Sequence, residues 1–300
     1  GHCQAKFWMK NIILVTGGAG FVGSNLIRLL LKKTNNSIIS LDNYSSGSKN
    51  NHIYHNKVKY ISGATHEIEK IILKYTKKIH TVFHFGEFAR IYQSFKRFDE
   101  CYKSNSIGTN AVFNYCLKNK IKLIYSATSA TLGNKGNDKN LSPYAFTKSK
   151  NLELLENLKR WFNFKYEIIY FYNVYGYGHI KRGPMATVIG IFEDQFEKKK
   201  LLTVVKPGSQ SRRFTHIDDT IEVCFDAWKS NRCAHYSISH KKSYTILQVA
   251  KMFKSPITFL KKRPGERFAS ALTRISLNNK VFRRYGKIDL KDYISSFIKK

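Results

Sequence analysis

Three glycines between a short apolar run and a helical pattern constrain the fold of this chain more than any other feature. Residues 12–15 read Ile-Ile-Leu-Val, Gly17, Gly20 and Gly23 follow, and residues 26–31 are largely apolar in a helical pattern. The first glycine permits a tight turn, the second admits a phosphate close to the backbone, and the third lets the helix pack on the strand. This arrangement predicts a strand–turn–helix unit that binds a dinucleotide, with the phosphates at the first amides of the helix.

Asp42 indicates which dinucleotide is bound. It follows the apolar segment 37–41, about 20 residues beyond the glycine turn, where the dinucleotide fingerprint requires an acid. Its carboxylate would accept hydrogen bonds from the adenosine ribose and repel a 2′-phosphate, which favours NAD over NADP. The residues expected at this end of the cofactor site are Gly17, Gly20, Phe21, Val22, Gly23, Asp42 and Asn43.

Strand-like and helix-like segments alternate through the first half of the chain, which is typical of a parallel sheet covered by helices on both faces. We therefore predict an α/β fold of the Rossmann type, with a doubly wound parallel sheet. The expected strands are 11–16, 37–41, 57–61, 80–85, 121–126 and 166–171, and the expected helices are 20–33, 66–78, 95–118, 144–162, 220–229 and 245–254.

The rhythm of the sequence changes after residue 175, where glycine, proline and basic residues separate shorter elements. This change predicts two domains. An NAD-binding domain covers 9–175 and is rejoined by segments near 210–235, while 176–300 form mainly a smaller substrate-binding domain.

The net charge of +32 over 300 residues limits the partners of the chain. The lysines are spread along the sequence in short runs, and no motif organises them for nucleic acid. We therefore expect a small anionic substrate rather than a nucleic acid. With 42% apolar residues and no stretch near the ~18 residues of a membrane span, we expect a globular chain without membrane insertion.

The cysteines and the N-terminal residues bear on the compartment. The five cysteines lack the spacing of metal ligands, which predicts reduced thiols and no metal site. The basic N-terminal residues lead directly into the first expected strand without a secretory pattern, so we expect a cytoplasmic protein and leave residues 1–8 out of the fold argument. The cysteines are Cys3, Cys101, Cys116, Cys224 and Cys233.

Three polar side chains are expected at the reactive end of the cofactor. Tyr144 and Lys148 are four residues apart at the start of a helix, so they share one face. An ammonium stabilises phenolate and lowers the high pKa of a tyrosine, which makes Tyr144 a usable base. Thr128, at the end of the fifth strand, is the hydroxyl best suited to hydrogen-bond the reacting oxygen. Tyr-x-x-x-Lys alone is common on exposed helices, but its order after the glycine turn and this hydroxyl favours a catalytic interpretation.

Together these motifs resemble the extended short-chain dehydrogenase/reductases, and within them the sugar-nucleotide epimerase/dehydratase branch. The resemblance runs from about Asn11 to the C-terminus. It is specific for the family and less so for the substrate. Besides the glycine turn and the Thr128, Tyr144 and Lys148 set, it rests on segments 82–85, 105–109, 171–176, 208–219 and 263–266.

The resemblance implies a role for each matching residue. Tyr144 would take the proton of a sugar hydroxyl, usually at C4, while a hydride passes to NAD, and Lys148 would bind the nicotinamide ribose. Thr128 would position the hydroxyl, and forked guanidinium groups suit the diphosphate. The remaining matches are Phe85, Gly86 and Asn105 at the cofactor and Asn173, Arg212 and Arg263 at the sugar and diphosphate.

Departures from the family pattern narrow the reaction. Dehydratases carry an acidic pair after the strand-end threonine, and decarboxylating relatives carry an acid there, but here Ser129 and Ala130 cannot perform acid–base chemistry. Relatives that epimerise a carbon beside a ketone need a further Cys, His or Lys, and we expect the one candidate, His179, to face solvent. Oxidation at C4 remains, either reversed from the other face by an epimerase or stopped at the ketone by a dehydrogenase.

Glu87 is the most unusual residue of the expected cofactor site. Gly86 and Glu87 stand where relatives carry two small residues after the fourth strand. The carboxylate would contact the sugar or pair with Arg90, and pairing is the expected arrangement. These features resemble a subgroup, the GDP-manno-heptose 4-dehydrogenases of capsule pathways. Further departures are Ala64 for an adenine-binding aspartate, Tyr170 for an arginine and Tyr177 for a proline.

We therefore expect an NAD-dependent enzyme that oxidises C4 of a UDP- or GDP-linked hexose or heptose for surface polysaccharide synthesis, with a GDP-heptose dehydrogenase favoured. A UDP-hexose 4-epimerase would use the same residues. A non-catalytic NAD-binding regulator is a rival from another class, although the complete catalytic set argues against it. Helices 95–118 and 144–162 would pair across a two-fold axis in a homodimer or larger assembly, unless both are buried within one chain.

Overall fold

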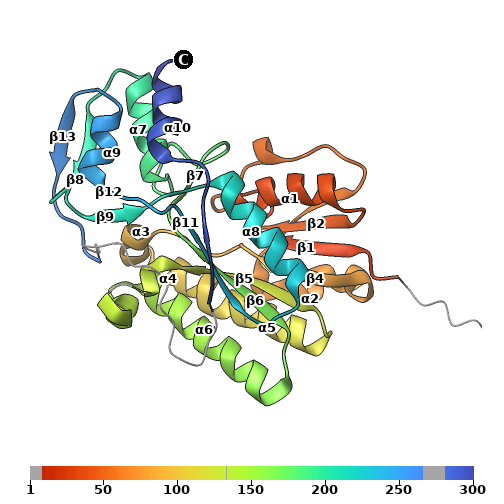
Figure 1. Cartoon of the computed structure of the whole chain (residues 1–300). Helices are drawn as coiled ribbons and strands as arrows, with labels where there is room; N and C mark the ends of the chain where they lie inside the picture. Colours follow the sequence, from red (N-terminus) through yellow and green to blue (C-terminus); the bar gives the residue numbers. More distant parts are fainter. Residues whose placement is uncertain (1–8, 133, 266–280) are drawn as a thin grey trace, which may run out of the picture.

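The structure is a computed structural model that describes residues 9–132, 134–265 and 281–300 (Figure 1). Its main feature is a parallel sheet in the order β14-β11-β6-β5-β4-β1-β2-β3. The predicted α/β, Rossmann-type doubly wound fold is confirmed. The strands are β1 (Ile12–Thr16), β2 (Ser37–Asp42), β3 (Val58–Ser62), β4 (Ile79–His84), β5 (Lys122–Thr128), β6 (Tyr166–Phe171), β11 (His235–Ser239) and β14 (Val281–Tyr285).

Helices cover both faces of the sheet, so its central strands are apolar on both sides. On one face α1 (Phe21–Lys33) packs against β1, and α8 (Ile217–Ser230) packs beside it against β6 and β11. On the other face α2 (Ile68–Ile72), α5 (Thr109–Lys118) and α6 (Pro143–Phe162) pack against the sheet, as Figure 1 shows. Because the strands are parallel, the residues that follow β1, β2, β4 and β5 meet at one edge, which we call the carboxyl edge.

The six strands predicted from the sequence are confirmed, each within two residues at its ends. Two of the predicted helices are wrong in detail because they are interrupted. Segment 66–78 contains α2 between 3₁₀ turns at Thr65–Glu67 and Leu73–Lys78. Segment 95–118 begins within α3 (Ile91–Lys96) and continues through α4 (Phe98–Tyr102), a π-helical turn (Lys103–Gly108) and α5.

Local contacts explain the interruption before α5. Arg97 leaves helical geometry, with φ −123° and ψ 48°, and separates α3 from α4. The buried Asn105 lies in the π-helical turn, and its amide accepts from the Phe88 N–H at 2.7 Å and donates to the Phe88 carbonyl at 3.0 Å. These bonds fix the segment that follows β4 against the helical layer.

A second lobe lies above the carboxyl edge in Figure 1 and has its own apolar core. It includes α7 (Val188–Glu197), α9 (Ile246–Met252) and α10 (Leu290–Ile298) beside the pair β8 (Leu202–Val205) and β13 (Ile257–Leu260). The remaining elements are the pairs β7 (Val174–Tyr175) with β10 (Thr215–His216) and β9 (Ser211–Arg213) with β12 (Ser243–Thr245), and 3₁₀ turns at Lys49–Asn51, Ser129–Thr131 and Asn134–Asn140.

Several expectations concern the chain as a whole. Segments 217–239 and 281–285 lie with the large sheet, while the predicted domain boundary at 175 remains a prediction. In the described ranges, Cys101, Cys116, Cys224 and Cys233 form no disulfide, and Cys3 lies outside them. None of the helices described is long and apolar enough for a membrane crossing.

Candidate functional site

The glycine turn between β1 and α1 forms one wall of a cleft at the carboxyl edge. Gly17 has φ +71°, and a Cβ atom on it would lie 2.9 Å from the Cα atom of Gly86. A Cβ on Gly23 would lie 2.2 Å from the Gly17 carbonyl oxygen. Only glycine fits such close approaches of backbone to backbone, so the turn is held tightly between β1, β4 and α1.

The cleft fits a dinucleotide. The N-cap residue of α1 is Gly20, and no side chain caps the helix there. The first amides of this helix are therefore open to an anion. At the end of β2, the Asp42 carboxylate accepts from the N–H groups of Ala19 at 3.0 Å and Tyr44 at 2.8 Å. Burial raises the pKa of Asp42, and these two bonds oppose the shift. The carboxylate is thereby fixed beside the turn, where a ribose would lie.

Most predicted cofactor residues line this cleft, and Asn105 does not. The side chain of Asn105 is buried and holds Phe88, as described above. Sequence reasoning missed part of the wall, because residues such as Lys103 in the π-helical turn and Met185 carry no motif. The predicted residues that line the cleft are Gly17, Gly20, Phe21, Val22, Gly23, Asp42, Asn43, Phe85, Gly86, Glu87 and Arg90.

The start of α6 brings Tyr144 and Lys148 to the carboxyl edge. Ser142 caps the helix by accepting from the Ala145 N–H at 3.0 Å, and Pro143 occupies the first helical position. Tyr144 is half-buried, and its N–H donates to the Ser94 hydroxyl at 3.3 Å. Lys148 lies one turn further on, and its side chain is only 4% exposed.

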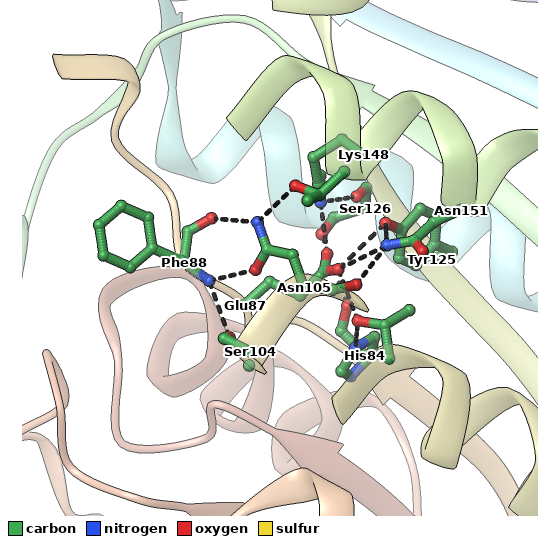
Figure 2. A network of polar contacts seen from close by, with 12 residues as sticks. His84, Glu87, Phe88, Ser104, Asn105, Tyr125, Ser126, Lys148 and Asn151 are labelled. Atoms are coloured by element: carbon green, nitrogen blue, oxygen red, sulfur yellow. Dashed lines mark hydrogen bonds and ion pairs between the residues drawn. The ribbon is translucent and has the colours of Figure 1, made fainter. Parts of the chain in front are cut away.

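Lys148 forms an ion pair with Glu87, which Figure 2 shows from close by. The Lys148 Nζ atom lies 2.5 Å from Glu87 Oε1 and also donates to the Ser126 carbonyl. The second carboxylate oxygen, Oε2, accepts from three donors. They are Thr109 Oγ1 at 2.6 Å, the Tyr125 hydroxyl at 3.1 Å and Asn151 Nδ2 at 3.2 Å.

The expected pairing of Glu87 with Arg90 is therefore wrong. The Arg90 guanidinium instead donates to the carbonyls of Met185 at 2.8 Å and Ala89 at 2.7 Å. Lysine reaches Glu87 because α6 crosses the sheet directly behind the loop that follows β4, an arrangement set by tertiary packing. A glutamate directly after a buried strand was the sequence signal for an unusual site, and its partner was not predictable from spacing.

A further hydrogen-bond chain connects Glu87 to the end of β1. His84 Nε2 lies 2.8 Å from Thr109 Oγ1, and His84 Nδ1 lies 2.7 Å from Thr16 Oγ1. Burial lowers the pKa of His84 to about 4, so the ring is neutral at pH 7. Since the one hydroxyl proton of Thr109 goes to Glu87, His84 must donate from Nε2 and accept at Nδ1. The chain thus runs in one direction, from Thr16 to the carboxylate.

The residues predicted to bind the substrate are less concentrated. Thr128 ends β5, is 8% exposed, and accepts from the Ala130 N–H at 3.1 Å. Asn173 donates to the Arg213 carbonyl at 3.0 Å, Arg212 is buried on β9, and Arg263 lies 4.4 Å from the ring centre of Tyr92. Among the described residues, those that line the cleft include none of these four, nor Tyr144 or Lys148. Lys148 contacts the cleft wall through its ion pair with Glu87, which is part of that wall.

The expectation that His179 faces solvent is wrong. Its side chain is 2% exposed, and Nε2 lies 2.5 Å from Glu193 Oε1 on α7. Its Nδ1 accepts from the Gly176 N–H at 3.3 Å. Both ring nitrogens therefore hold the loop after β7 against α7. The glycines near His179 along the chain did not indicate this burial.

Comparison with known proteins identifies the family. The model of a family described as NAD dependent epimerase/dehydratase matches residues 13–238. The chain belongs to this family. Members are NAD-dependent enzymes, so the predicted NAD cofactor and the predicted kinship with extended short-chain dehydrogenase/reductases are confirmed.

Individual relatives span most of the chain. A putative UDP-glucose 4-epimerase of Methanocaldococcus jannaschii is 27% identical and covers 96% of this chain and 97% of its own. An ADP-L-glycero-D-manno-heptose-6-epimerase of Brachyspira hyodysenteriae is 26% identical and covers 81% of this chain and 80% of its own. The solved UDP-glucose 4-epimerase of Thermotoga maritima is 22% identical, covers 96% and 97%, and has a TM-score of 0.84. The last likeness concerns the fold.

Proposed function

We propose that this family member oxidises C4 of a nucleotide-activated sugar to a 4-keto sugar, with Tyr144 as the base. The observation that carries the proposal is the buried Lys148 one helical turn from Tyr144, at the edge of the sheet that also holds the glycine turn. The relatives named as epimerases of UDP- or ADP-linked sugars support a nucleotide-sugar substrate.

The chain's own residues account for the proton transfer. Tyr144 takes the proton from the C4 hydroxyl, and the Lys148 ammonium stabilises the phenolate and holds the cofactor ribose. Thr128 Oγ1 accepts from Ala130 but keeps its own proton, which it donates to the sugar oxygen. NAD, when bound, supplies the hydride acceptor.

Two outcomes of the 4-keto intermediate are supported. A dehydrogenase releases the ketone, and the departures after β4 favour a GDP-linked heptose and a role in capsule or other surface polysaccharide synthesis. A UDP-hexose 4-epimerase returns the hydride to the other face, and the Methanocaldococcus jannaschii relative bears that name. Elimination of water is disfavoured, because Ser129 and Ala130 occupy the turn after Thr128 and provide no acid–base group.

We also propose a homodimer in the cytoplasm, formed through the helices that flank the site. Phe98 and Tyr102 on α4 are exposed, and so are Phe95 on α3 and Phe146 near the start of α6. A patch of large apolar side chains on neighbouring helices is typical of a surface covered by a second subunit. Sedimentation of the purified protein tests this, since a monomer would contradict it.

The first experiment is incubation of the protein, without added cofactor, with UDP- and GDP-linked hexoses and heptoses, and NMR of the products. A C4-inverted sugar over many turnovers identifies an epimerase. A 4-keto sugar limited to about one per site, with NADH left on the protein, identifies a dehydrogenase that needs an external oxidant. Tyr144→Phe should abolish turnover while NAD stays bound, and turnover retained by this variant would contradict the mechanism.

A further inference from the structure

The ion pair between Glu87 and Lys148 is more deeply buried than positioning a lysine requires. The two side chains are 3% and 4% exposed, and removing two charges from water is unfavourable even when they pair. A carboxylate at position 87 therefore needs an explanation beyond packing.

Four donors surround this carboxylate. Lys148, Thr109, Tyr125 and Asn151 all donate to it, and an ionised carboxylate can only accept. Neutral His84 supplies the donor that orients Thr109 toward Glu87. These contacts come from four elements, β4, α5, β5 and α6, and they hold both carboxylate oxygens in place. The negative charge is thereby fixed 2.5 Å from the ammonium.

The pair also determines the charge of the cleft beside Tyr144. The groups around Lys148 and Tyr144 include Glu87, Arg90, His84, Cys101 and Tyr125. Burial lowers the pKa of His84 to about 4, raises that of Cys101 to about 11 and raises that of Tyr125, so these three are neutral at pH 7. Lys148 and Arg90 are the positive groups of this set, and Glu87 is the negative one. Glu100 and Lys103 also line the cleft and carry opposite charges, so together they leave its net charge unchanged.

This balance bears on the redox state of the cofactor. Oxidised NAD carries a positive charge on its nicotinamide ring, and the reduced form does not. Beside two uncompensated cations, the oxidised form would be repelled, and the reduced form would be affected much less. Glu87 lines the same cleft as the glycine turn, so its charge acts at the cofactor as well as at Lys148.

We propose that Glu87 is a positioning residue that fixes Lys148 and neutralises its charge, so that the cleft binds oxidised NAD beside Tyr144. The proposal rests on the proposed function, because that function places the nicotinamide beside Lys148. It assigns the glutamate to the cofactor's redox state rather than to the sugar. Replacing it with a small uncharged residue would shift the site toward NADH.

The ratio of NAD⁺ affinity to NADH affinity tests this proposal without any sugar. We would measure both dissociation constants near pH 7 for the wild type, Glu87→Gln, Lys148→Gln and the double variant. Glu87→Gln should lower the ratio on the order of tenfold, and Lys148→Gln should raise it on the order of tenfold. The double variant, which has the same net charge as the wild type, should return it to within about threefold of the wild-type ratio. Loss of the ribose contact of Lys148 weakens both forms alike and cancels in the ratio.

A matched control is available at the other end of the sheet. Glu167 on β6 is buried and pairs with Lys122 at 3.6 Å, and Glu167→Gln should leave the ratio unchanged. Equal loss of both affinities in Glu87→Gln, or a double variant that does not recover, would overturn the proposal. If Glu87→Gln does not fold, the affinity ratios of Lys148→Gln and the double variant still test the proposal, with a rise expected for the first and a ratio near the wild type for the second.

The outcome is separable from that of the proposed function. A ratio that follows the charges while no sugar nucleotide is turned over would leave Glu87 in its role and reject the reaction. Turnover that depends on Tyr144, together with an affinity ratio that does not change in the charge variants, would support the reaction and reject the role of Glu87.

Discussion

Two buried glutamate–lysine pairs lie at opposite edges of the same sheet and differ in what surrounds them. At the carboxyl edge, Glu87 pairs with Lys148 and accepts from side chains of three further residues. At the amino edge, Glu167 on β6 pairs with Lys122 on β5. Its carboxylate accepts from three backbone N–H groups, those of Arg232 at 3.3 Å, Cys233 at 3.0 Å and Ala234 at 3.1 Å. It also accepts from the hydroxyls of Tyr236 at 3.0 Å and Ser230 at 3.4 Å.

The difference separates a structural ion pair from one that serves a site. Backbone donors fix the path of the chain, so Glu167 holds the turn between α8 and β11. Side-chain donors from separate elements fix the orientation of one group, so the contacts of Glu87 orient the carboxylate toward Lys148. Ligands of parallel α/β sheets bind at the carboxyl edge, which is where the second kind of pair is found.

The largest effect is expected when each glutamate loses its charge. Glu87→Gln leaves Lys148 buried without a counter-ion, and the free energy of unfolding should fall by about 3–5 kcal/mol. Glu167→Gln should cost less, because Lys122 is 14% exposed and also donates to the Trp228 carbonyl and to Asn231 at 2.7 Å. Urea unfolding of both variants checks the order. A larger loss for Glu167→Gln would show that the amino-edge pair is the more tightly coupled of the two.

Acid should weaken both edges equally. His84 ends β4 at the carboxyl edge and His235 begins β11 at the amino edge, and burial lowers the pKa of each from 6.5 to about 4. The folded state therefore holds both rings neutral, and their stabilisation is fully present above pH 6.5 and is lost as the pH falls through 4. Each should contribute a loss of about 2 kcal/mol between pH 7 and pH 5.

The variant His235→Gln tests this linkage. It removes one of the two titrating rings, so the loss of stability between pH 7 and pH 5 should shrink by about 2 kcal/mol. The wild type, measured by urea unfolding at both pH values, is the reference. An unchanged pH dependence would mean that His235 already titrates normally in the folded protein, in spite of its burial.

Much of the fold follows from local patterns, and so do most cofactor residues. The glycine turn, its strand and its helix are consecutive in the sequence, and Asp42 is one strand further on. Apolar runs located five of the six strands because these are buried in the sheet, while β3, at the end of the strand order, is only partly buried. The interruption of 95–118 was not predictable in this way. It accompanies the hydrogen bonds between Asn105 in the π-helical turn and Phe88, which lie 17 positions apart in the sequence.

The carboxyl-edge pair shows where local reasoning ends. Glu87 and Lys148 are 61 positions apart, and each was singled out for a separate reason. Their contact depends on how α6 crosses the sheet, and Arg90 was a nearer partner in sequence only. His179 was misjudged for the same reason, because its partner Glu193 lies on α7, beyond the glycine-rich loop.

The smallest effect is expected at Asn231, beside the amino-edge pair. It ends α8 in the left-handed conformation, with φ 50°, and accepts from Lys122 Nζ at 2.7 Å. Asn231→Gly loses an exposed hydrogen bond but gains the residue that best adopts this conformation, so the free energy of unfolding should change by less than about 1 kcal/mol. Asn231→Ala loses the same bond and strains the backbone, which should place it about 1 kcal/mol below the glycine variant.

Urea unfolding of the two variants separates the backbone effect from the lysine contact, because both lack the side-chain oxygen. Equal stabilities would mean that the left-handed conformation costs alanine nothing here. The affinity for NAD should equal that of the wild type in both, since Asn231 lies at the edge away from the cleft. A changed affinity would break the comparison between the edges, because it would mean that the amino-edge pair acts on the cofactor site through β5, the strand that carries Lys122 at one end and Thr128 at the other.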